Sequence, residues 1–157
     1  MTENRPINLL PIGWVRSTRR HIADDHWESE DVAIELDEAQ FSPEALAGLE
    51  DFSHVEIIFY MHHVQADQVC RGARHPRGNR AYPRTGIFAQ RARNRPNALG
   101  LTVSRLIKIE KHSIILGGLD AVDGTPVLDI KPWVAEFGPR GRVSRPEWMA
   151  EIMADYW

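Results

Sequence analysis

The architecture of this chain is set by residues 54–61, which read HVEIIFYM. β-Branched and aromatic side chains fill most of this run, which is typical of a largely buried β-strand. Apolar residues alternate with polar ones in the stretch Asp31 to Leu36, as expected for a strand with one buried face. Similar short runs, separated by turn-rich connections, occur at Ile7 to Val15, Gly86 to Gln90, Leu101 to Ile109, Ser113 to Leu119 and Val127 to Ile130. About seven short strands with this spacing predict an all-β body, either closed or sandwiched.

Two short helices are expected between and after the strands. Ser42 before Pro43 resembles an N-cap followed by a proline in the first turn, which predicts a helix from Pro43 to Leu49. Ser144 and Glu147 have the spacing of a capping box, which predicts a C-terminal helix over Pro146 to Ala154.

Length and composition favour one soluble domain over residues 1–157. A chain of 157 residues with 43% hydrophobic and 26% charged residues can bury a continuous core without disulfides. Its longest apolar runs are too short to span a bilayer, and residues 1–10 do not resemble a secretion signal. A single cysteine, Cys70, cannot form an internal bridge. We therefore expect a cytoplasmic protein that makes no membrane contact.

Charge is concentrated in residues 71–95, which we call the arginine segment. The segment carries eight arginines and no acidic residue, whereas the net charge of the whole chain is −3. Its prolines and glycines disfavour a long helix that would spread the guanidinium groups over a solvated face. Arginine without lysine favours two-point contacts to carboxylate or phosphate groups, so we expect an anionic partner.

Two further runs carry polar groups on turns between apolar stretches. Residues 86–101 display Arg91, Arg93 and Arg95 at alternate positions, and these could equally pair with surface acids. Residues 119–133 hold three aspartates and an Asp-Gly turn, where a carboxylate can accept hydrogen bonds from a ribose or an amine. An Asx-turn combined with a salt bridge is the structural alternative for at least one of these aspartates.

Both runs resemble the hallmark segments of the TsaA-like family, which is typified by tRNA-methyltransferase O. The matching segments are GIFAQRA at 86–92, RPNALGLT at 95–102 and DGTPVLDIKPW at 123–133. PIGWVRS at 11–17 and GLEDFSHVEIIFYMHH at 48–63 also resemble family segments, so the resemblance covers roughly residues 6 to 133. Long matches in a fixed order are highly specific.

The resemblance implies a compact β-barrel, commonly a homodimer, that binds S-adenosylmethionine without a Rossmann domain. It further implies methyl transfer to the threonylcarbamoyl-modified adenosine next to the tRNA anticodon. Carried over by position, the cofactor site comprises His62, His63, Arg91, Leu101, Asp123, Gly124, Thr125 and Pro126. For the acceptor RNA we expect contacts from Arg77, Arg84, Arg93, Arg95 and Asn97.

The chain also departs from the family pattern. Ala92 and Ala98 stand where the tRNA enzymes have serine and proline, and residues 24–28 replace an N-terminal Pro-Arg-Gln element. These departures leave two alternatives open: a methyltransferase that acts on a small molecule or another nucleoside, and a nucleotide- or RNA-binding module without transfer activity.

Three smaller expectations concern individual residues. His62 or His63 could act as a base, because a histidine titrates near neutrality. The spacing of the histidines around Cys70 matches no standard zinc pattern, so we expect no metal. Trp27, in a loop beside acidic residues, is the expected ligand lid.

Overall fold

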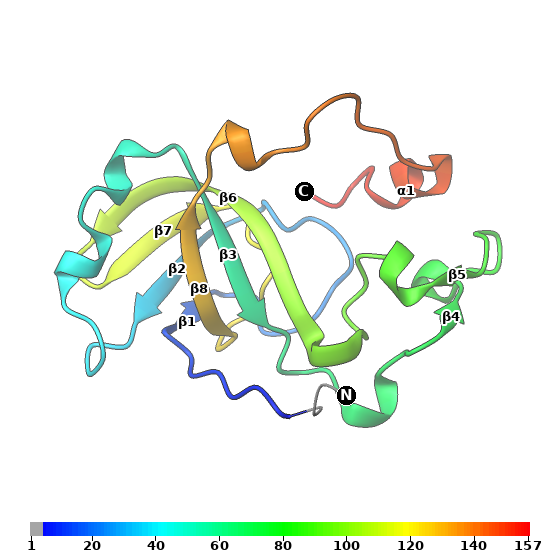
Figure 1. Ribbon diagram of the computed structural model, residues 1–157, viewed down its shortest axis with the longest axis horizontal. Coiled ribbons are helices and arrows are strands. Elements are labelled where there is room, and N and C mark those ends of the chain that lie inside the picture. The colour runs from blue at the N-terminus through cyan, green and yellow to red at the C-terminus, as the bar shows by residue number, and fades with distance from the viewer. Residues whose placement is uncertain (1–4) are drawn as a thin grey trace.

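The computed structural model describes residues 5–157 as a closed, antiparallel barrel of six strands in the order β1-β2-β7-β6-β3-β8 (Figure 1). Residues 1–4, which begin the expected single domain and the stretch that does not resemble a secretion signal, lie outside the described residues. The barrel strands are β1 (Gly13–Arg16), β2 (Asp31–Leu36), β3 (His54–Tyr60), β6 (Leu99–Glu110), β7 (Ser113–Gly117) and β8 (Pro126–Pro132). The predicted all-β barrel with a C-terminal helix is confirmed.

Alternation of side chains along the strands fills the barrel interior. In β2, Val32, Ile34 and Leu36 are buried while the residues between them face outward, as the sequence pattern predicts. The core consists almost entirely of aliphatic side chains, with Phe59 as its one ring among the buried cluster of the described residues. Burial of these apolar surfaces is the main stabilising contribution to the barrel.

Two strand predictions need correction. Residues 86–90 do not form a barrel strand: β5 (Thr85–Gly86) pairs with β4 (Ala73–Arg74) in a separate small sheet, and a 3-10 turn, η5 (Ile87–Ala89), follows. The predicted strand over residues 7–15 begins only at Gly13, the first residue that pairs with β2 and β8, although the Ile12 amide still donates to the Val127 carbonyl at 2.8 Å. The exposed apolar side chains of residues 7–10 therefore do not contribute to the barrel core.

The helices are shorter than predicted. The helix after β2 consists of two 3-10 turns, η1 (Pro43–Leu46) and η2 (Leu49–Asp51), and the Ser42 side chain makes no capping hydrogen bond. The C-terminal helix α1 (Glu147–Ile152) begins after Pro146, so the predicted Ser144–Glu147 capping box does not form. The remaining 3-10 turns are η3 (Ala66–Gln68), η4 (Pro76–Gly78), η6 (Pro96–Ala98) and η7 (Ala135–Phe137). Within residues 5–157, no helix has the length and apolar character needed to cross a membrane.

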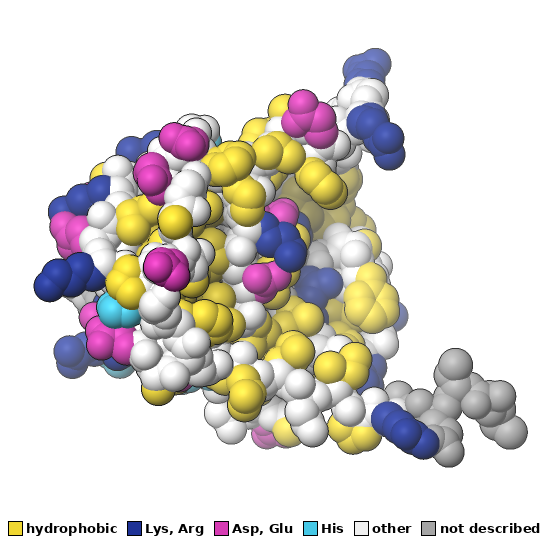
Figure 2. Space-filling view, turned by 60° about the vertical axis from the view of Figure 1, so that its left-hand side comes forward, with side chains coloured by type: hydrophobic (Ala, Val, Ile, Leu, Met, Phe, Trp, Pro, Cys, Tyr) yellow, Lys and Arg dark blue, Asp and Glu magenta, His cyan; other side chains and the backbone are white. Residues whose placement is uncertain are grey.

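The two ends of the barrel are closed in different ways. At one end, which we call the closed end, β6 and β7 are joined by the tight turn at residues 111–112, and η1 and η2 cover the connection from β2 to β3. An apolar hollow of about 540 Å³ lies there, lined mainly by side chains of β2, η1, η2 and β8. Figure 2 brings this side forward and shows hydrophobic side chains with charges of both signs around and among them.

The other end, which we call the open end, receives three connections, one of which is the longest in the chain. The pairs Arg16–Ala33, Tyr60–Leu99 and Asp31–Gly117 show that β1, β3 and β7 finish where β2 and β6 begin. Connections 17–30, 61–98 and 118–125 therefore all emerge at this end, and the arginine segment forms most of the longest one. Figure 1 shows its small sheet β4–β5 to the right of the barrel, below α1.

Strand β6 extends beyond its neighbour β7. Pairing between the two strands stops at Arg105–Gly117, whereas β6 continues to pair with β3 as far as Leu99. One edge of residues 99–104, which we call the free edge of β6, therefore faces the connections of the open end instead of another strand. Unpaired main-chain groups on such an edge need partners from side chains, water or a ligand.

Candidate functional site

The open end brings together the sequence segments that were predicted to form the site. His62 and His63 follow the end of β3, Arg91 lies in the connection that leads into β6, and Asp123 precedes β8. Antiparallel order explains this convergence, because each of these segments lies at the strand end that reaches the open end. The predicted cofactor residues thus lie at the same end of the barrel although 64 positions separate the first from the last.

The histidine pair presents an unused ring nitrogen. The ring centroids of His62 and His63 are 4.1 Å apart, and His62 Nδ1 is buried without a hydrogen-bond partner within the described chain. Burial, and then the nearby His63, lower the pKa of His62 below its ordinary value of about 6.5. At neutral pH the His62 imidazole is therefore uncharged, and its second ring nitrogen can accept a hydrogen bond or a proton.

Arg91 is fixed against the free edge of β6. Its Nη2 donates a hydrogen bond to the carbonyl oxygen of Leu101 at 2.8 Å. The Leu101 side chain points outward from the barrel and is 43% exposed, so the main chain of Leu101 is the part that faces Arg91. The guanidinium keeps further N–H groups for an anion, because this is its only hydrogen bond within residues 5–157.

Residues 123–126 form a braced turn. The Asp123 carboxylate accepts a hydrogen bond from the Ser17 amide at 3.1 Å, and the Asp123 amide donates to the Arg19 carbonyl at 2.8 Å. Gly124 has a φ of 77°, a left-handed conformation that glycine adopts without strain. The Thr125 hydroxyl is buried and donates to the Val122 carbonyl at 2.7 Å, so only main-chain atoms and Asp123 remain for a ligand.

A second carboxylate at the open end was missed by the sequence reasoning. Asp120 accepts hydrogen bonds from the hydroxyls of Thr102, on the free edge of β6, and Tyr156, near the chain end. Burial, and then Asp120, raise the pKa of Tyr156 far above its ordinary value, while the Arg91 charge acts weakly in the opposite direction. Tyr156 therefore stays protonated. Arg91 lies close enough to this cluster for its charge to act on the pKa of Tyr156. Asp120 was visible as the first of three aspartates, but no motif pointed to Tyr156.

The residues expected to contact RNA fall into two groups. Arg77 is occupied, since its guanidinium donates two hydrogen bonds to Asp25, at 2.7 and 3.1 Å, and one to the Ile152 carbonyl. Arg95 Nη1 donates to the Gln90 carbonyl at 2.8 Å and so holds its own loop together. The side chains of Arg84 and Arg93 have no hydrogen-bond or ion-pair partner within residues 5–157.

A backbone turn at Asn97 and an ion pair between Asp25 and Arg77 shape the loops that carry these arginines. Asn97 is exposed and has a φ of 65°, which turns the chain into β6. The Asp25–Arg77 ion pair lowers the pKa of Asp25 and raises the pKa of Arg77, mainly through the hydrogen bond between them. Arg77 also donates a hydrogen bond to the end of α1. This one side chain therefore links three parts of the chain: residues 24–28, the arginine segment and the C-terminal helix.

The prediction that Trp27 forms a ligand lid is wrong. Its side chain is only 7% exposed, and the Arg19 guanidinium lies 4.2 Å from the centre of its ring. The Trp27 amide also bonds the Tyr156 carbonyl at 2.9 Å, so this loop packs on the C-terminal tail. A tryptophan beside acidic residues suggested exposure, whereas the cation–π contact with Arg19 and the tail account for its burial.

Buried polar groups without partners are concentrated beside the open end. Within the described residues, the buried side-chain atoms that lack a hydrogen-bond partner are His62 Nδ1, Arg74 Nε, Gln90 Oε1 and Asn94 Oδ1. All four lie between positions 62 and 94, in the connection that contains the arginine segment. An unpaired buried polar atom is costly, and a bound ligand is one way to satisfy it. Among residues 5–157, no group of three His, Cys, Asp or Glu side chains could hold a metal ion.

Comparisons with known proteins agree with this arrangement. Residues 22–138 match the family model described as the tRNA-methyltransferase O N-terminal domain. The human tRNA (adenine(37)-N6)-methyltransferase is 46% identical over 103 residues, which cover 65% of this chain and 23% of that protein. A probable S-adenosyl-L-methionine-binding protein of Methanothermobacter thermautotrophicus is 35% identical over 138 residues, covering 86% of this chain and 96% of that protein.

Solved structures give the same result. A crystal structure of TrmO from Pseudomonas aeruginosa superposes with a TM-score of 0.72 at 33% identity, covering 90% of this chain and 62% of that chain. The chain spans only 21% to 39% of the length of the first few curated relatives it matches. Much of each of those proteins therefore has no counterpart in the residues compared.

Proposed function

Because the chain belongs to the family of the tRNA-methyltransferase O N-terminal domain, we propose that it is an S-adenosylmethionine-dependent methyltransferase. The proposed acceptor is N6 of threonylcarbamoyladenosine next to the tRNA anticodon, in keeping with the names of the human and Escherichia coli relatives. The observation that carries the proposal is that the family-like segments 86–92 and 95–102 and the start of the segment 123–133 all lie at the open end of the barrel.

The polar groups at the open end fit the methyl donor. Arg91 keeps N–H groups free beside the free edge of β6 and would bind the carboxylate of the donor. His62 offers a buried, unpaired ring nitrogen next to His63, and the main chain at Leu101 would receive the nucleoside. The turn from Asp123 to Pro126 would contribute its carboxylate and its main-chain groups. When bound, S-adenosylmethionine supplies a methyl group activated by a sulfonium centre.

The residues of the chain would act mainly by positioning and by handling a proton. An in-line transfer requires donor and acceptor atoms to be held about 3 Å apart in a site with little water. The acceptor nitrogen must also lose a proton. His62 is neutral at physiological pH, because burial lowers its pKa, and would accept that proton or relay it to solvent.

For the acceptor RNA we propose contacts from the arginine segment. Arg84 and Arg93, whose side chains have no partner within the described chain, would contact phosphates directly. Arg77 and Arg95 already bond other parts of the chain and would act by holding the loops in place. Asn97 would contact the RNA from the turn before β6.

We further propose that the protein is a cytoplasmic homodimer. Tyr60, Leu99, Leu101 and Val103 are adjacent on the outer face of β3 and β6, and each is about 40% exposed. Such an apolar strip on a sheet surface supports a contact with a second copy. Val103→Glu would introduce a charge into this strip, and sedimentation or light scattering should then report a monomer.

Calorimetry with S-adenosylmethionine tests the cofactor site. Arg91→Ala should weaken binding by about 10- to 100-fold, because a charge-assisted hydrogen bond contributes about 1.5–3 kcal/mol. Arg91→Lys should recover part of the affinity, since it retains the charge without the planar fork. Lys108→Ala, at the closed end, is the matched control that also removes one positive charge and should bind as the parent does. Equal affinity of the parent and Arg91→Ala would refute the assignment.

A second candidate function is binding without transfer. It is favoured by the relative from Methanothermobacter thermautotrophicus, which this chain covers almost completely and which is named as a binding protein. Incubation with radiolabelled methyl donor and total tRNA separates the two candidates. Label in the tRNA, located by mass spectrometry at the modified adenosine, supports methyl transfer, whereas donor binding without label in RNA supports the binding module.

A further inference from the structure

A second group of cations lies outside the arginine segment. Residues 137–145, which we call the basic arm, contain Phe137, Arg140, Arg142 and Arg145 and no acidic residue. The arm lies almost wholly beyond the residues matched by the family model, which end at 138. It connects η7 to α1 and runs in Figure 1 from β8 across the top of the molecule to α1.

The arginines of the basic arm are exposed and unpaired. None of the three makes a hydrogen bond or ion pair with any residue from 5 to 157, and all three are exposed. Gly141, with a φ of 86°, turns the chain between Arg140 and Arg142. Three like charges this close in sequence repel each other, and no ion pair within the described chain compensates them.

An exposed aromatic ring accompanies these arginines. Phe137, at the end of η7, is 88% exposed, although a phenyl ring in a soluble protein normally packs against other apolar groups. The arginine segment has a similar pair of features, since Phe88 is 79% exposed and lies three residues before Arg91. Exposed rings beside arginines are the combination that binds unpaired nucleic-acid bases by stacking and their phosphates by charge.

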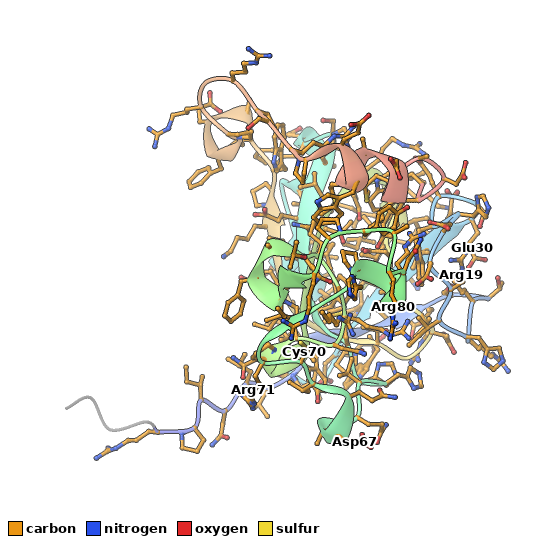
Figure 3. All side chains as sticks on the ribbon, turned by 90° about the vertical axis from the view of Figure 1, so that its right-hand side faces the viewer. Arg19, Glu30, Asp67, Cys70, Arg71 and Arg80 are labelled. Carbon is orange, nitrogen blue, oxygen red and sulfur yellow. The ribbon has the colours of Figure 1, made fainter. Side chains whose placement is uncertain are left out.

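Contacts through α1 tie the basic arm to the arginine segment. Arg145 directly precedes Pro146, the N-cap of α1. The Trp148 ring of α1 lies 6.4 Å from the Tyr82 ring, and the Ile152 carbonyl accepts a hydrogen bond from Arg77 at 3.2 Å. Figure 3 shows the loop before α1 at the top, with nitrogen-ended side chains projecting outward, and the labelled Arg71 and Arg80 below it. One ligand that reaches both groups must therefore be long and carry several negative charges.

We propose that the basic arm is a second RNA-binding surface, in which Arg140, Arg142 and Arg145 bind phosphates and Phe137 stacks on an unpaired base. This inference rests on the proposed function, because it assumes that the methyl acceptor is an RNA. It adds a contact outside the barrel that would hold the acceptor while its modified adenosine reaches the open end.

Binding of a labelled tRNA anticodon stem-loop, followed by fluorescence anisotropy over a series of salt concentrations, tests the arm. Replacing Arg140, Arg142 and Arg145 with alanine should weaken binding about tenfold or more, and should reduce the salt slope by about 2–3. The control variant, with Lys108, Lys111 and Lys131 replaced by alanine, loses the same charge mainly at the closed end and should keep the parent's slope.

Variants of Phe137 test the stacking contact separately from charge. Phe137→Leu should weaken binding by about 5-fold or more because it removes the aromatic face, whereas Phe137→Tyr should bind as the parent does. All variants should bind S-adenosylmethionine with unchanged affinity, which also shows that they are folded.

The outcomes separate this inference from the proposed function. If replacement of Arg84 and Arg93 abolishes RNA binding while the arm variants bind normally, the proposed function stands and the arm inference is wrong. If the parent binds S-adenosylmethionine but no RNA, both the tRNA acceptor and the arm inference fail. Competition by polyglutamate as effective as competition by polyuridylate would show a general anion surface and would also overturn the inference.

Discussion

The same strands form both ends of the barrel, but one end is packed with apolar side chains and the other contains buried polar groups. At the closed end, the tight turn between β6 and β7 and the apolar side chains of η1 and η2 seal the core. The open end instead contains all the buried polar residues found within residues 5–157: Gln90, Thr102, Ser104 and Thr125. Apolar packing is satisfied without a ligand, whereas a polar interior depends on each hydrogen bond being made. Stability is therefore expected to depend mainly on the core, and ligand recognition on the open end.

The largest expected effect on the free energy of unfolding comes from a substitution in the core. Ile57→Ala removes most of a fully buried side chain in the middle of β3 and should destabilise the fold by about 2–5 kcal/mol. Ile58 follows Ile57 in β3 and faces outward. Ile58→Ala is therefore the control and should lower the free energy of unfolding much less. Urea unfolding measures both variants, and a similar loss in the two would contradict the inside–outside assignment.

Sequence patterns predicted the core well because local alternation determines it. Residues 31–36 form a strand with the predicted bounds, and the run at 54–61 is a barrel strand except for its last residue. The motif segments also meet at one end, since antiparallel pairing brings the relevant strand ends together. These features need only the period of the side chains and the order of the strands.

Long-range polar contacts could not be predicted in the same way. Residues 86–90 look like a strand, yet the Gln90 amide bonds main-chain atoms of Arg74 and Thr85 and folds the chain into a turn. The bond from Tyr156 to Asp120 joins residues 36 positions apart, and neither residue lies in a pattern that indicates the other. Such hydrogen-bond partners depend on how the connections of the open end pack together, and the local sequence pattern does not determine that packing.

The next largest expected effect on stability comes from replacing Gln90, at the open end. Its side-chain nitrogen donates to the Arg74 and Thr85 carbonyls at 3.0 and 2.9 Å in a buried position. Gln90→Ala leaves both carbonyls without this donor and should destabilise the protein by about 2–3 kcal/mol. Asp67→Ala, at an exposed residue of the same connection whose side chain makes no hydrogen bond within residues 5–157, should change stability little. Hydrogen exchange should show that the loss in Gln90→Ala is concentrated in residues 71–95, and uniform loss over the barrel would contradict the comparison.

Tyr156→Phe should have a smaller effect on stability, about 1–2 kcal/mol, because Asp120 keeps its bond from Thr102. The pKa of Tyr156 is raised by burial, so the unfolded chain releases the tyrosine proton at lower pH than the folded protein does. The stabilising contribution is thus present below about pH 10 and is lost as the pH rises above it. Thermal unfolding at pH 8 and pH 11 should show a steeper decline for the parent than for Tyr156→Phe. Parallel declines would contradict the buried hydrogen bond.

The smallest expected effect concerns His62 and the stability between pH 7 and pH 5. Its folded pKa is lowered by burial and by His63, so the unfolded chain takes up a proton first as the pH falls below about 6.5. The free energy of unfolding should therefore decrease over this range, and His62→Gln should reduce the decrease. His63→Gln removes only the second cause and should give an intermediate slope. Asp25 does not contribute between pH 7 and pH 5. The hydrogen bond from Arg77 lowers the pKa of Asp25, so this carboxylate is protonated only below that range. If all three proteins show one slope, His62 is as solvated as a surface histidine, and the unpaired nitrogen proposed to meet the ligand would lose its support.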